Sequence, residues 1–189
     1  MQAELTTEEL GAALREHAYL EGDFVLRSGK RSRYYLDKYR FETRPDLLGP
    51  LGERIAEAVA EHEPEATRLA GPELGAVPLA AAASLASGLP FLIVRKGAKE
   101  YGTANRLEGV FEPGESVCLV EDVVTSGGAA VSAIEALREA GLTCRTAVCV
   151  VDREEGGAAA LADVAVRLLP LFCARELIGL EKPPEKRDG

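Results

Sequence analysis

Hydrophobic and polar positions along the chain follow two periods, one typical of helices and one typical of strands. Helical periodicity runs from a capping box formed by Thr6 and Glu9 to about Tyr19. Residues 23–39, DFVLRSGKRSRYYLDKY, then predict a β-hairpin with its turn at Ser28–Gly29. The N-terminal part is therefore expected to fold as one helix followed by two short strands.

From residue 45 onward, helical stretches and short apolar runs take turns along the chain. A helix is predicted over 45–62, where Pro45 suits the first turn and Pro50 leaves open a kink or a restart. Strands are then expected over 67–70, 91–94, 116–122, 143–152 and 164–172, and helices over 77–87, 129–141 and 158–163. Such alternation is typical of an α/β fold with a central parallel sheet covered by helices.

Four loops of unusual composition leave the carboxyl ends of the predicted strands. They span residues 71–78, 95–110, 121–128 and 152–157. In an open α/β sheet, ligands bind at this edge. The sequence therefore predicts a functional site built from these four loops.

Length and composition indicate one globular domain. The 189 residues, 47% hydrophobic and 28% charged, should bury roughly 70% of the unfolded surface around one core. The longest apolar run, 75–94, is broken by Pro78, Gly88 and Pro90, so we expect no membrane span. The first ten residues are acidic and lack the apolar stretch of a secretory signal, so we expect a cytoplasmic protein.

Cysteine and histidine are sparse. The four cysteines form no CxxC pair, and Cys118 and Cys149 fall in apolar strand-like runs, so we expect reduced core residues. His17 and His62 lie far apart on charged helical stretches and are expected at the surface. A His-based metal site or a His-dependent catalytic triad is therefore not expected.

Charge is unevenly distributed along the chain. The net charge of −9 argues against general affinity for nucleic acid. Residues 27–40 nevertheless carry six basic residues and one acid, and residues 95–109 carry four basic residues and two acids. Two positive segments in an acidic protein suggest a small polyanion as ligand, although either run alone could be a solvated face.

The stretch VCLVEDVVTSGG, residues 117–128, puts a flexible loop after a buried strand. Thr125 and Ser126 supply hydroxyls, Gly127 and Gly128 let the backbone approach a ligand, and the next helix points its positive end inward. This arrangement suits a phosphate monoester, although an ordinary strand–helix turn uses the same residues. The lysine of the GxxxxGK(S/T) loop is missing, which disfavours nucleotide hydrolysis.

Two acids, Glu121 and Asp122, precede this loop. Ionised side chains at the end of a buried strand would cost several kcal/mol if they were dehydrated without donors. The vicinal hydroxyls of a ribose can act as donors, alone or through Mg²⁺, which prefers oxygen ligands. The acids and the loop together predict a site for a ribose 5-phosphate.

VCLVEDVVTSGG resembles the phosphoribosyl-diphosphate (PRPP) signature of type I phosphoribosyltransferases, in the version found in orotate phosphoribosyltransferases. The resemblance extends from about Gly22 to Glu154. It implies a single domain, 1–189, with a Rossmann-like core over about 45–170 and a small hood formed by about residues 1–40 and C-terminal elements. It also implies a homodimer that uses Mg²⁺ to transfer ribose 5-phosphate from PRPP to orotate, giving orotidine 5′-monophosphate and pyrophosphate in de novo pyrimidine biosynthesis.

The same resemblance assigns the PRPP-binding residues. Glu121 and Asp122 match the acids that hold the ribose hydroxyls and are the candidate contacts to Mg²⁺. The segment around the 5-phosphate comprises Val123, Val124, Thr125, Ser126, Gly127, Gly128 and Ala129. AGPELGAVPLA resembles the pyrophosphate loop, in which N–H groups of Glu73, Leu74 and Gly75 face the diphosphate and a strained or cis peptide would fit. Read alone, GPELG is an ordinary turn.

RKGAKEYG resembles the family's catalytic lid, which closes over the diphosphate and is shared across the dimer. Arg95, Lys96 and Lys99 match its basic positions and, with Asp122, are the candidate catalytic residues. A basic loop of this length independently suggests a mobile functional segment. Tyr101, also assigned to PRPP, stands where some members have a histidine, so an imidazole acting on pyrophosphate cannot be assumed.

FVLRSGKRSRYYLDK and VVDREEGG resemble the two orotate-binding segments. The resemblance assigns Arg27, Tyr34, Tyr35, Thr125 and Arg153 to orotate, with the tyrosines beside the ring and Arg153 on the base. Arg27 replaces the family's common lysine, which leaves its contact open. Without the resemblance, Arg153 could be an exposed loop charge.

The implied reaction needs little activation of the nucleophile, because pyrophosphate leaves readily and orotate has an acidic ring nitrogen. This agrees with the lack of an obvious acid–base histidine. Two alternatives stay open at this point: a phosphoribosyltransferase for a purine or another pyrimidine, and a non-catalytic PRPP-sensing regulator. The regulator would be expected to carry a basic nucleic-acid surface or an added domain, and the sequence indicates neither.

Overall fold

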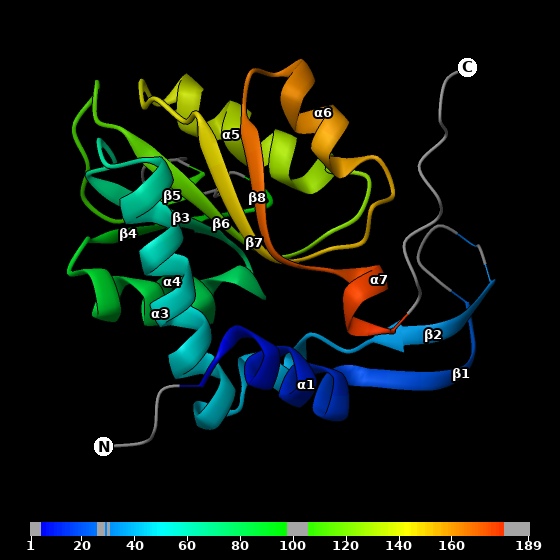
Figure 1. Ribbon diagram of the computed structural model, residues 1–189. Helices are drawn as coiled ribbons and strands as arrows, with labels where there is room; N and C mark the ends of the chain where they lie inside the picture. Colours follow the sequence, from blue (N-terminus) through cyan, green and yellow to red (C-terminus); the bar gives the residue numbers. More distant parts are fainter. Residues whose placement is uncertain (1–4, 26–28, 30, 98–105, 180–189) are drawn as a thin grey trace, which may run out of the picture.

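The computed structural model describes residues 5–25, 29, 31–97 and 106–179. Its centre is a six-stranded sheet in the order β5-β4-β3-β6-β7-β8, with helices on both faces (Figure 1). The strands are β3 (Arg68–Pro72), β4 (Phe91–Val94), β5 (Leu107–Glu108), β6 (Val117–Val124), β7 (Thr146–Asp152) and β8 (Arg167–Cys173). Five of them are mutually parallel, and β5 runs antiparallel beside β4. The expected helix-covered parallel sheet is confirmed.

One helical layer covers each face of the sheet. α3 (Pro45–His62) and α4 (Ala76–Ser87) pack on one face, and α5 (Gly128–Glu139) and α6 (Gly157–Asp163) lie on the other. Strand β6 contributes to both layers: Cys118 and Val120 belong to the core under α3 and α4, and Leu119 to the core under α5. A strand buried on both faces reads as a continuous apolar run, which is why this segment was recognisable in the sequence.

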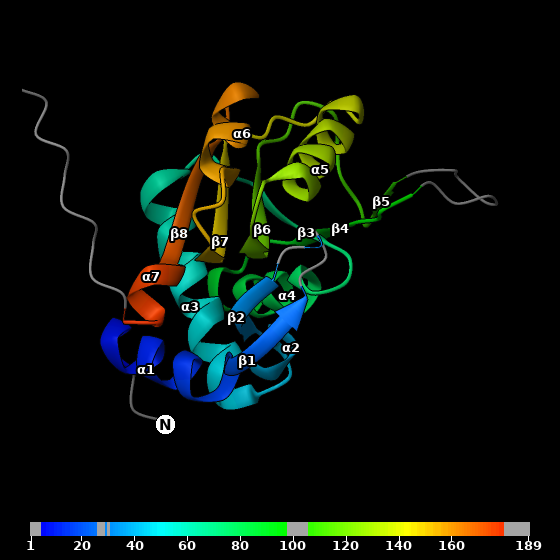
Figure 2. The same cartoon turned by 90° about the vertical axis from the view of Figure 1, so that its right-hand side faces the viewer.

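The N-terminal elements lie beside the sheet at the edge where the parallel strands end (Figure 2). They are α1 (Thr7–Ala18), the antiparallel hairpin β1 (Tyr19–Val25) and β2 (Arg31–Leu36), and α2 (Tyr39–Glu42). A C-terminal helix, α7 (Ala174–Leu177), packs against α1. The predicted capping box starts α1, with Glu9 N donating to Thr6 Oγ1 at 3.2 Å and Thr6 N to Glu9 Oε2 at 2.9 Å.

Helix α3 runs without a break from Pro45 to His62, so the helix does not restart at Pro50. The clash that a proline imposes on its neighbour involves the neighbour's Cβ, and the preceding residue here is Gly49. Leu47, Leu51 and Ile55 then bury the inner face of the helix on both sides of the proline. Packing thus holds the helix together across the missing backbone donor.

Several boundaries differ from the prediction. The strand expected over 116–122 continues to Val124, because β6 pairs with β7 as far as Val124 opposite Asp152. Residues 143–145 were expected in a strand, but β7 begins at Thr146. The hairpin begins at Tyr19 rather than Asp23. The short elements α2, β5 and α7 were not predicted, since two to four residues are too few to show a period.

The cysteines lie as expected, with one partial exception. Cys118, Cys144 and Cys149 are buried and Cys173 is half-buried, and all four are free. His62 is exposed and His17 is half-buried. Among the described residues, no helix combines the length and apolar character that a bilayer crossing requires.

Candidate active site

A cavity of about 660 Å³ lies at the carboxyl ends of β3 and β6. It brings together α2, the loop after β3, the start of the loop after β4, and the turn from β6 into α5. Its lining residues are Lys38, Tyr39, Pro72, Glu73, Leu74, Lys96, Glu121, Asp122, Val123, Val124, Thr125, Ser126, Gly127, Gly128, Ala129 and Ala130. Three of the four loops predicted to form the site therefore meet at one cavity.

The acid pair lies inside strand β6 and not at its end, because the strand continues two residues further than predicted. Asp122 is 5% exposed and both of its carboxylate oxygens are bonded: Val123 N donates to Oδ1 and Lys38 Nζ to Oδ2, each at 2.5 Å. Lys38 thus supplies the donor that the sequence argument required for a buried acid. This partner was missed, although Lys38 belongs to the basic segment 27–40.

Glu121 is buried as deeply but lacks such a partner. It is 6% exposed, and its Oε1 has no hydrogen-bond partner among the described residues. Burial, and next the charge of Asp122, raises the pKa of Glu121 to about 8. A buried acceptor that faces a cavity without a protein donor is available to a ligand hydroxyl.

The turn after β6 has the shape expected of an anion cradle. Thr125, Ser126, Gly128 and Ala129 are exposed to the cavity, while Gly127 is buried with a φ of +82°. A Cβ on Gly127 would lie 3.1 Å from Gly157 of α6. The close approach of the turn to α6 therefore favours a residue without a side chain. Helix α5 begins immediately afterwards, and its first N–H groups point toward this end of the cavity.

The loop after β3 forms the opposite wall. The peptide between Glu73 and Leu74 is cis, in agreement with the strained or cis peptide that would fit this loop. Glu73 accepts a hydrogen bond from Lys96 N at 2.8 Å, so this loop contacts the start of the loop after β4. Gly75 is buried directly beside Asp122. The lid positions Arg95 and Lys96 are therefore anchored next to the predicted diphosphate loop.

The Arg95 side chain forms ion pairs with two glutamates. Its guanidinium lies 3.4 Å from Glu108 Oε1 and 3.9 Å from Glu73 Oε2. Lys96 lines the cavity, whereas Arg95 does not. The predicted site residues Lys99, Tyr101 and Arg27 lie outside the described residues.

Of the residues predicted to bind orotate, the structure brings Tyr34 and Arg153 together. The Arg153 guanidinium carbon lies 5.4 Å from the centroid of the Tyr34 ring, and Tyr34 also stacks on Tyr19 at 5.7 Å. Arg153 N donates to the Val124 carbonyl at 2.9 Å, which places Arg153 beside Thr125. Its side chain is only 9% exposed, so Arg153 is not an exposed loop charge.

Tyr35 is separated from this group. Successive side chains of a strand point to opposite faces, and Tyr35 packs on Phe24 at 5.6 Å between ring centroids. It is 41% exposed. The two adjacent tyrosines therefore do not lie side by side over one surface.

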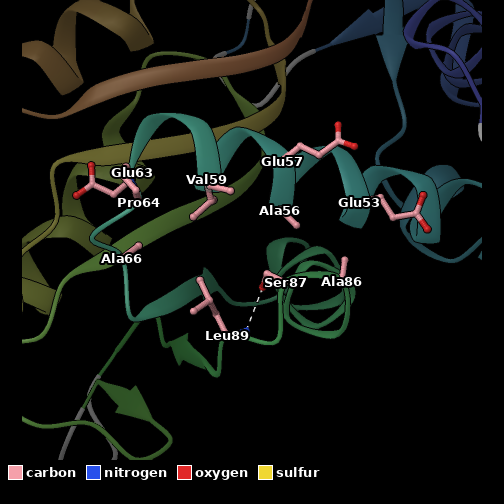
Figure 3. A pocket seen from close by; sticks show the side chains of 11 residues that line it. Glu53, Ala56, Glu57, Val59, Glu63, Pro64, Ala66, Ala86, Ser87 and Leu89 are labelled. Carbon is pink, nitrogen blue, oxygen red and sulfur yellow. Dashed lines mark hydrogen bonds between the residues drawn. The ribbon is translucent and has the colours of Figure 1, made fainter.

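Figure 3 shows a second cavity, of about 500 Å³, between the C-terminal half of α3 and the last turn of α4. Its floor is formed by small apolar side chains, and Glu53, Glu57 and Glu63 line it without any basic residue. Because α4 starts at the first cavity, the second lies at the far end of that helix. Its charge makes it unsuitable for an anionic substrate.

A scan of known protein-family models finds no match to this chain. The chain is 52% identical over 159 residues to an orotate phosphoribosyltransferase of Methanocella arvoryzae, covering 84% of this chain and 89% of the relative. It is 49% identical over 176 residues to an orotate phosphoribosyltransferase of Halobacterium salinarum, covering 93% and 98%.

Solved structures show the same similarity. Orotate phosphoribosyltransferase of Mycobacterium tuberculosis, crystallised with Fe(III) dicitrate, superposes with a TM-score of 0.81 at 29% identity, covering 90% of this chain and 98% of that one. The complex of the M. tuberculosis protein with PRPP superposes with a TM-score of 0.77 at 28% identity over the same shares.

Proposed function

Because the chain belongs to the orotate phosphoribosyltransferase family, we propose that it transfers ribose 5-phosphate from PRPP to orotate and releases pyrophosphate, a step of pyrimidine biosynthesis. One observation carries the proposal for this chain's own residues. A single cavity joins the buried acids Glu121 and Asp122 to the exposed turn formed by residues 125–129. A sugar with vicinal hydroxyls and a terminal phosphate is complementary to both ends of that cavity.

PRPP fits the cavity in one direction. Its 5-phosphate takes the N–H groups and hydroxyls of residues 125–129, and its ribose hydroxyls donate to Glu121 and Asp122. The diphosphate then reaches the wall formed by Glu73 and Leu74, where Lys96 also lines the cavity. Hydrogen-bond donors thus lie at the 5-phosphate end, Lys96 lies at the diphosphate end, and the acids lie at the sugar between them.

Orotate is assigned to the space near Arg153 and Tyr34. A guanidinium offers a planar fork that matches a carboxylate, and the Nε of Arg153 is buried without a partner among the described residues. The neighbouring Tyr34 ring offers an aromatic surface to a pyrimidine. Thr125 is the first residue of the phosphate turn. It follows Val124, whose carbonyl accepts from Arg153 N, so it also lies next to this space.

The reaction breaks the bond between ribose C1 and a diphosphate oxygen, and the diphosphate leaves with the electron pair. The ring nitrogen of orotate gives its proton to solvent and forms the new bond to C1, through a transition state that resembles an oxocarbenium ion. Catalysis consists mainly of holding two anions in line and stabilising charge on the leaving group. Lys96 is placed for that second task, and the lid residue Lys99 is assigned to it by resemblance.

Magnesium dependence is part of the proposal. The described residues contain no group of three side chains suited to hold a metal ion, so a cation would take most of its oxygen ligands from substrate and water. The unpartnered Oε1 of Glu121 is the protein oxygen best able to contribute. When bound, Mg²⁺ would neutralise charge on the diphosphate.

A homodimer that shares the lid is likewise proposed. Helix α4 carries no charged residue, and its apolar positions Val77, Ala81 and Leu85 follow one another on one face, with Leu85 89% exposed. Val77 and Ala81 are half-buried and Leu85 is exposed, so the face is only partly covered, which favours contact with a second protein surface. A cytoplasmic location is also proposed, and the four free cysteines support it.

The proposal is tested by turnover. Purified protein with PRPP, Mg²⁺ and orotate should consume orotate, seen as a fall in its absorbance, and mass spectrometry should identify orotidine 5′-monophosphate. Adenine, hypoxanthine and uracil serve as competing bases. The assigned substrate would be refuted if pyrophosphate release did not depend on orotate but increased when one of these bases was added. PRPP binding without any turnover would identify a sensor instead of an enzyme.

A further inference from the structure

The Lys38 ammonium lies between the acids of β6 and the loop after β3. Its Nζ is 2.5 Å from Asp122 Oδ2, although the two residues are 84 positions apart in the sequence. Lys38 immediately precedes α2, so this contact joins the N-terminal elements to the central sheet. The side chain is 31% exposed and lines the cavity, which leaves its ammonium accessible to a ligand.

Gly75 shows how closely these groups approach the diphosphate loop. A Cβ at this position would lie 1.9 Å from Asp122 Oδ2, 2.6 Å from Lys38 Nζ and 2.8 Å from Glu42 Oε1. Three side chains therefore converge on one point against the loop backbone. The loop itself, Glu73–Leu74–Gly75, contains no basic side chain. The Lys38 ammonium lies next to the space that a side chain at position 75 would fill.

The acids around Lys38 explain the position of its ammonium. Glu42, Glu121 and Asp122 are all buried, and Lys38 is the cation hydrogen-bonded to one of them. Glu42 Oε1 has no hydrogen-bond partner among the described residues. Burial alone would lower the pKa of Lys38, but the hydrogen bond and charge of Asp122 outweigh burial, and the pKa is raised.

We propose that Lys38 is a further PRPP-binding residue, which neutralises Asp122 in the empty site and contacts the diphosphate once PRPP is bound. This proposal rests on the proposed function. The ammonium donates to Asp122 Oδ2 and Val123 N donates to Oδ1, so a ribose hydroxyl would compete with the ammonium for this carboxylate. When the ammonium turns toward the diphosphate, Asp122 is free to accept from the sugar. A flexible lysine suits this exchange better than a fixed arginine fork.

Glu42 has a defined place in this exchange. It lies four residues after Lys38, one helical turn away, and its unpartnered oxygen faces the same point beside Gly75. After Asp122 has been released, Glu42 offers the ammonium a second acceptor next to the loop. Lys38 is thereby kept near the diphosphate.

Calorimetric titration with two fragments of the substrate tests the proposal. Pyrophosphate with Mg²⁺ probes the diphosphate site alone, and ribose 5-phosphate probes the sugar and the 5-phosphate. In Lys38→Met, pyrophosphate affinity should fall about tenfold or more, the usual loss for a hydrogen bond to a charged group. Ribose 5-phosphate should bind as well as to the wild type, or better. Lys38→Arg should restore most of the pyrophosphate affinity.

Arg40→Met is the matched control. Arg40 lies two residues after Lys38, in α2, and its replacement also removes one positive charge, but Arg40 contacts Asp37 and the His17 carbonyl outside the cavity. Both fragments should bind this variant as they bind the wild type.

Asp122→Asn supplies an independent measurement in case Lys38→Met does not fold. It should weaken ribose 5-phosphate and leave pyrophosphate binding intact, because the ammonium is retained. Unchanged pyrophosphate affinity in Lys38→Met would overturn the proposal, as would a loss confined to ribose 5-phosphate. If the wild type itself failed to bind PRPP and to turn over orotate, the proposed function would fail instead, so both are measured first.

Discussion

The guanidinium of Arg153 lies over the ring of Tyr34, with 5.4 Å between the guanidinium carbon and the ring centroid. Arg153 follows strand β7 of the central sheet, and Tyr34 belongs to strand β2 of the hairpin. The contact therefore joins the hairpin to the central sheet, two parts of the chain that are far apart in sequence. It also leaves the arginine Nε without a partner among the described residues.

Replacing Arg153 by methionine should weaken orotate binding selectively. The guanidinium is the assigned partner of the orotate carboxylate, and a charge-assisted pair contributes about 1.5–3 kcal/mol, or roughly 10- to 100-fold in affinity. We expect the KM for orotate to rise by that factor while the KM for PRPP stays near the wild-type value. Steady-state kinetics with each substrate varied in turn measures both.

Arg167→Met is a suitable control for this variant. Arg167 is exposed at the start of β8, at the end of the sheet remote from the cavity. It should leave both KM values unchanged. An Arg153→Met enzyme with a normal KM for orotate would remove Arg153 from the base site.

The acid pair should be essential for PRPP and dispensable for folding. In the double variant Glu121→Gln, Asp122→Asn, the ribose hydroxyls lose their carboxyl acceptors, and kcat/KM for PRPP should fall by about 100-fold or more. Both substitutions preserve side-chain volume, so the far-ultraviolet spectrum and cooperative melting should persist. Full activity in a folded double variant would rule out the assigned role.

Gly75→Ala should damage the site through a steric clash. The new Cβ would lie 1.9 Å from Asp122 Oδ2 and 2.6 Å from Lys38 Nζ, so at least one of these groups must move. Overpacking of this kind costs about 1–3 kcal/mol, and we expect a comparable loss of PRPP affinity, about 10- to 100-fold. Titration with PRPP measures the effect.

Gly49→Ala provides the comparison. Gly49 lies in α3, and a Cβ there would meet no atom within 4 Å apart from its chain neighbours and its own helix backbone. It should leave PRPP affinity unchanged, because any effect of the new Cβ on Pro50 stays within α3, away from the cavity. Wild-type PRPP affinity in Gly75→Ala would show that the loop is not held against Asp122 as described.

Glu42 should make stability depend on pH. Burial, and next the charge of Asp122, raises the pKa of Glu42 to about 8, while Lys38 lowers it and Asp37 raises it further. Between the ordinary value of 4.5 and about 8, the folded protein keeps a proton that the unfolded chain releases. The stabilisation is therefore complete below pH 4.5 and is lost as pH rises through about 8.

The variant Glu42→Gln should remove that dependence. Without divalent cations or substrate, wild-type stability should fall by on the order of 2 kcal/mol more than variant stability between pH 5 and pH 9. Chemical denaturation across this range measures the difference. Glu135→Gln, at an exposed position of α5, should keep the wild-type profile. Parallel profiles for wild type and Glu42→Gln would contradict the prediction.

The fold was largely predictable because its signals are local. The alternation of periods along residues 67–172 is a property of each segment, and it gave the order of strands and helices in the chain. Boundaries failed where pairing with a neighbour decides the outcome: β6 continues to Val124 because β7 runs beside it. Nothing in the residues Glu121 and Asp122 themselves shows that the strand continues beyond them.

The candidate site was predictable only in part, for a similar reason. Loops at strand ends are forced to one edge by the parallel topology, so the meeting of residues 72–74, 96 and 121–130 followed from the fold. The pairing of Lys38 with Asp122 depends on how the N-terminal elements dock onto the sheet, which no local pattern encodes. Alternation along β2 could have separated Tyr34 from Tyr35, but the resemblance treated them as a pair.

A crystal soaked with PRPP and Mg²⁺ tests the central claim most directly, because it shows which groups hold the sugar. We predict the ribose hydroxyls on the carboxylates of Glu121 and Asp122, with the 5-phosphate on the N–H groups of residues 125–129. The account would be contradicted if the cavity stayed empty at saturating PRPP. It would also be contradicted if the sugar bound elsewhere while protein side chains filled these positions.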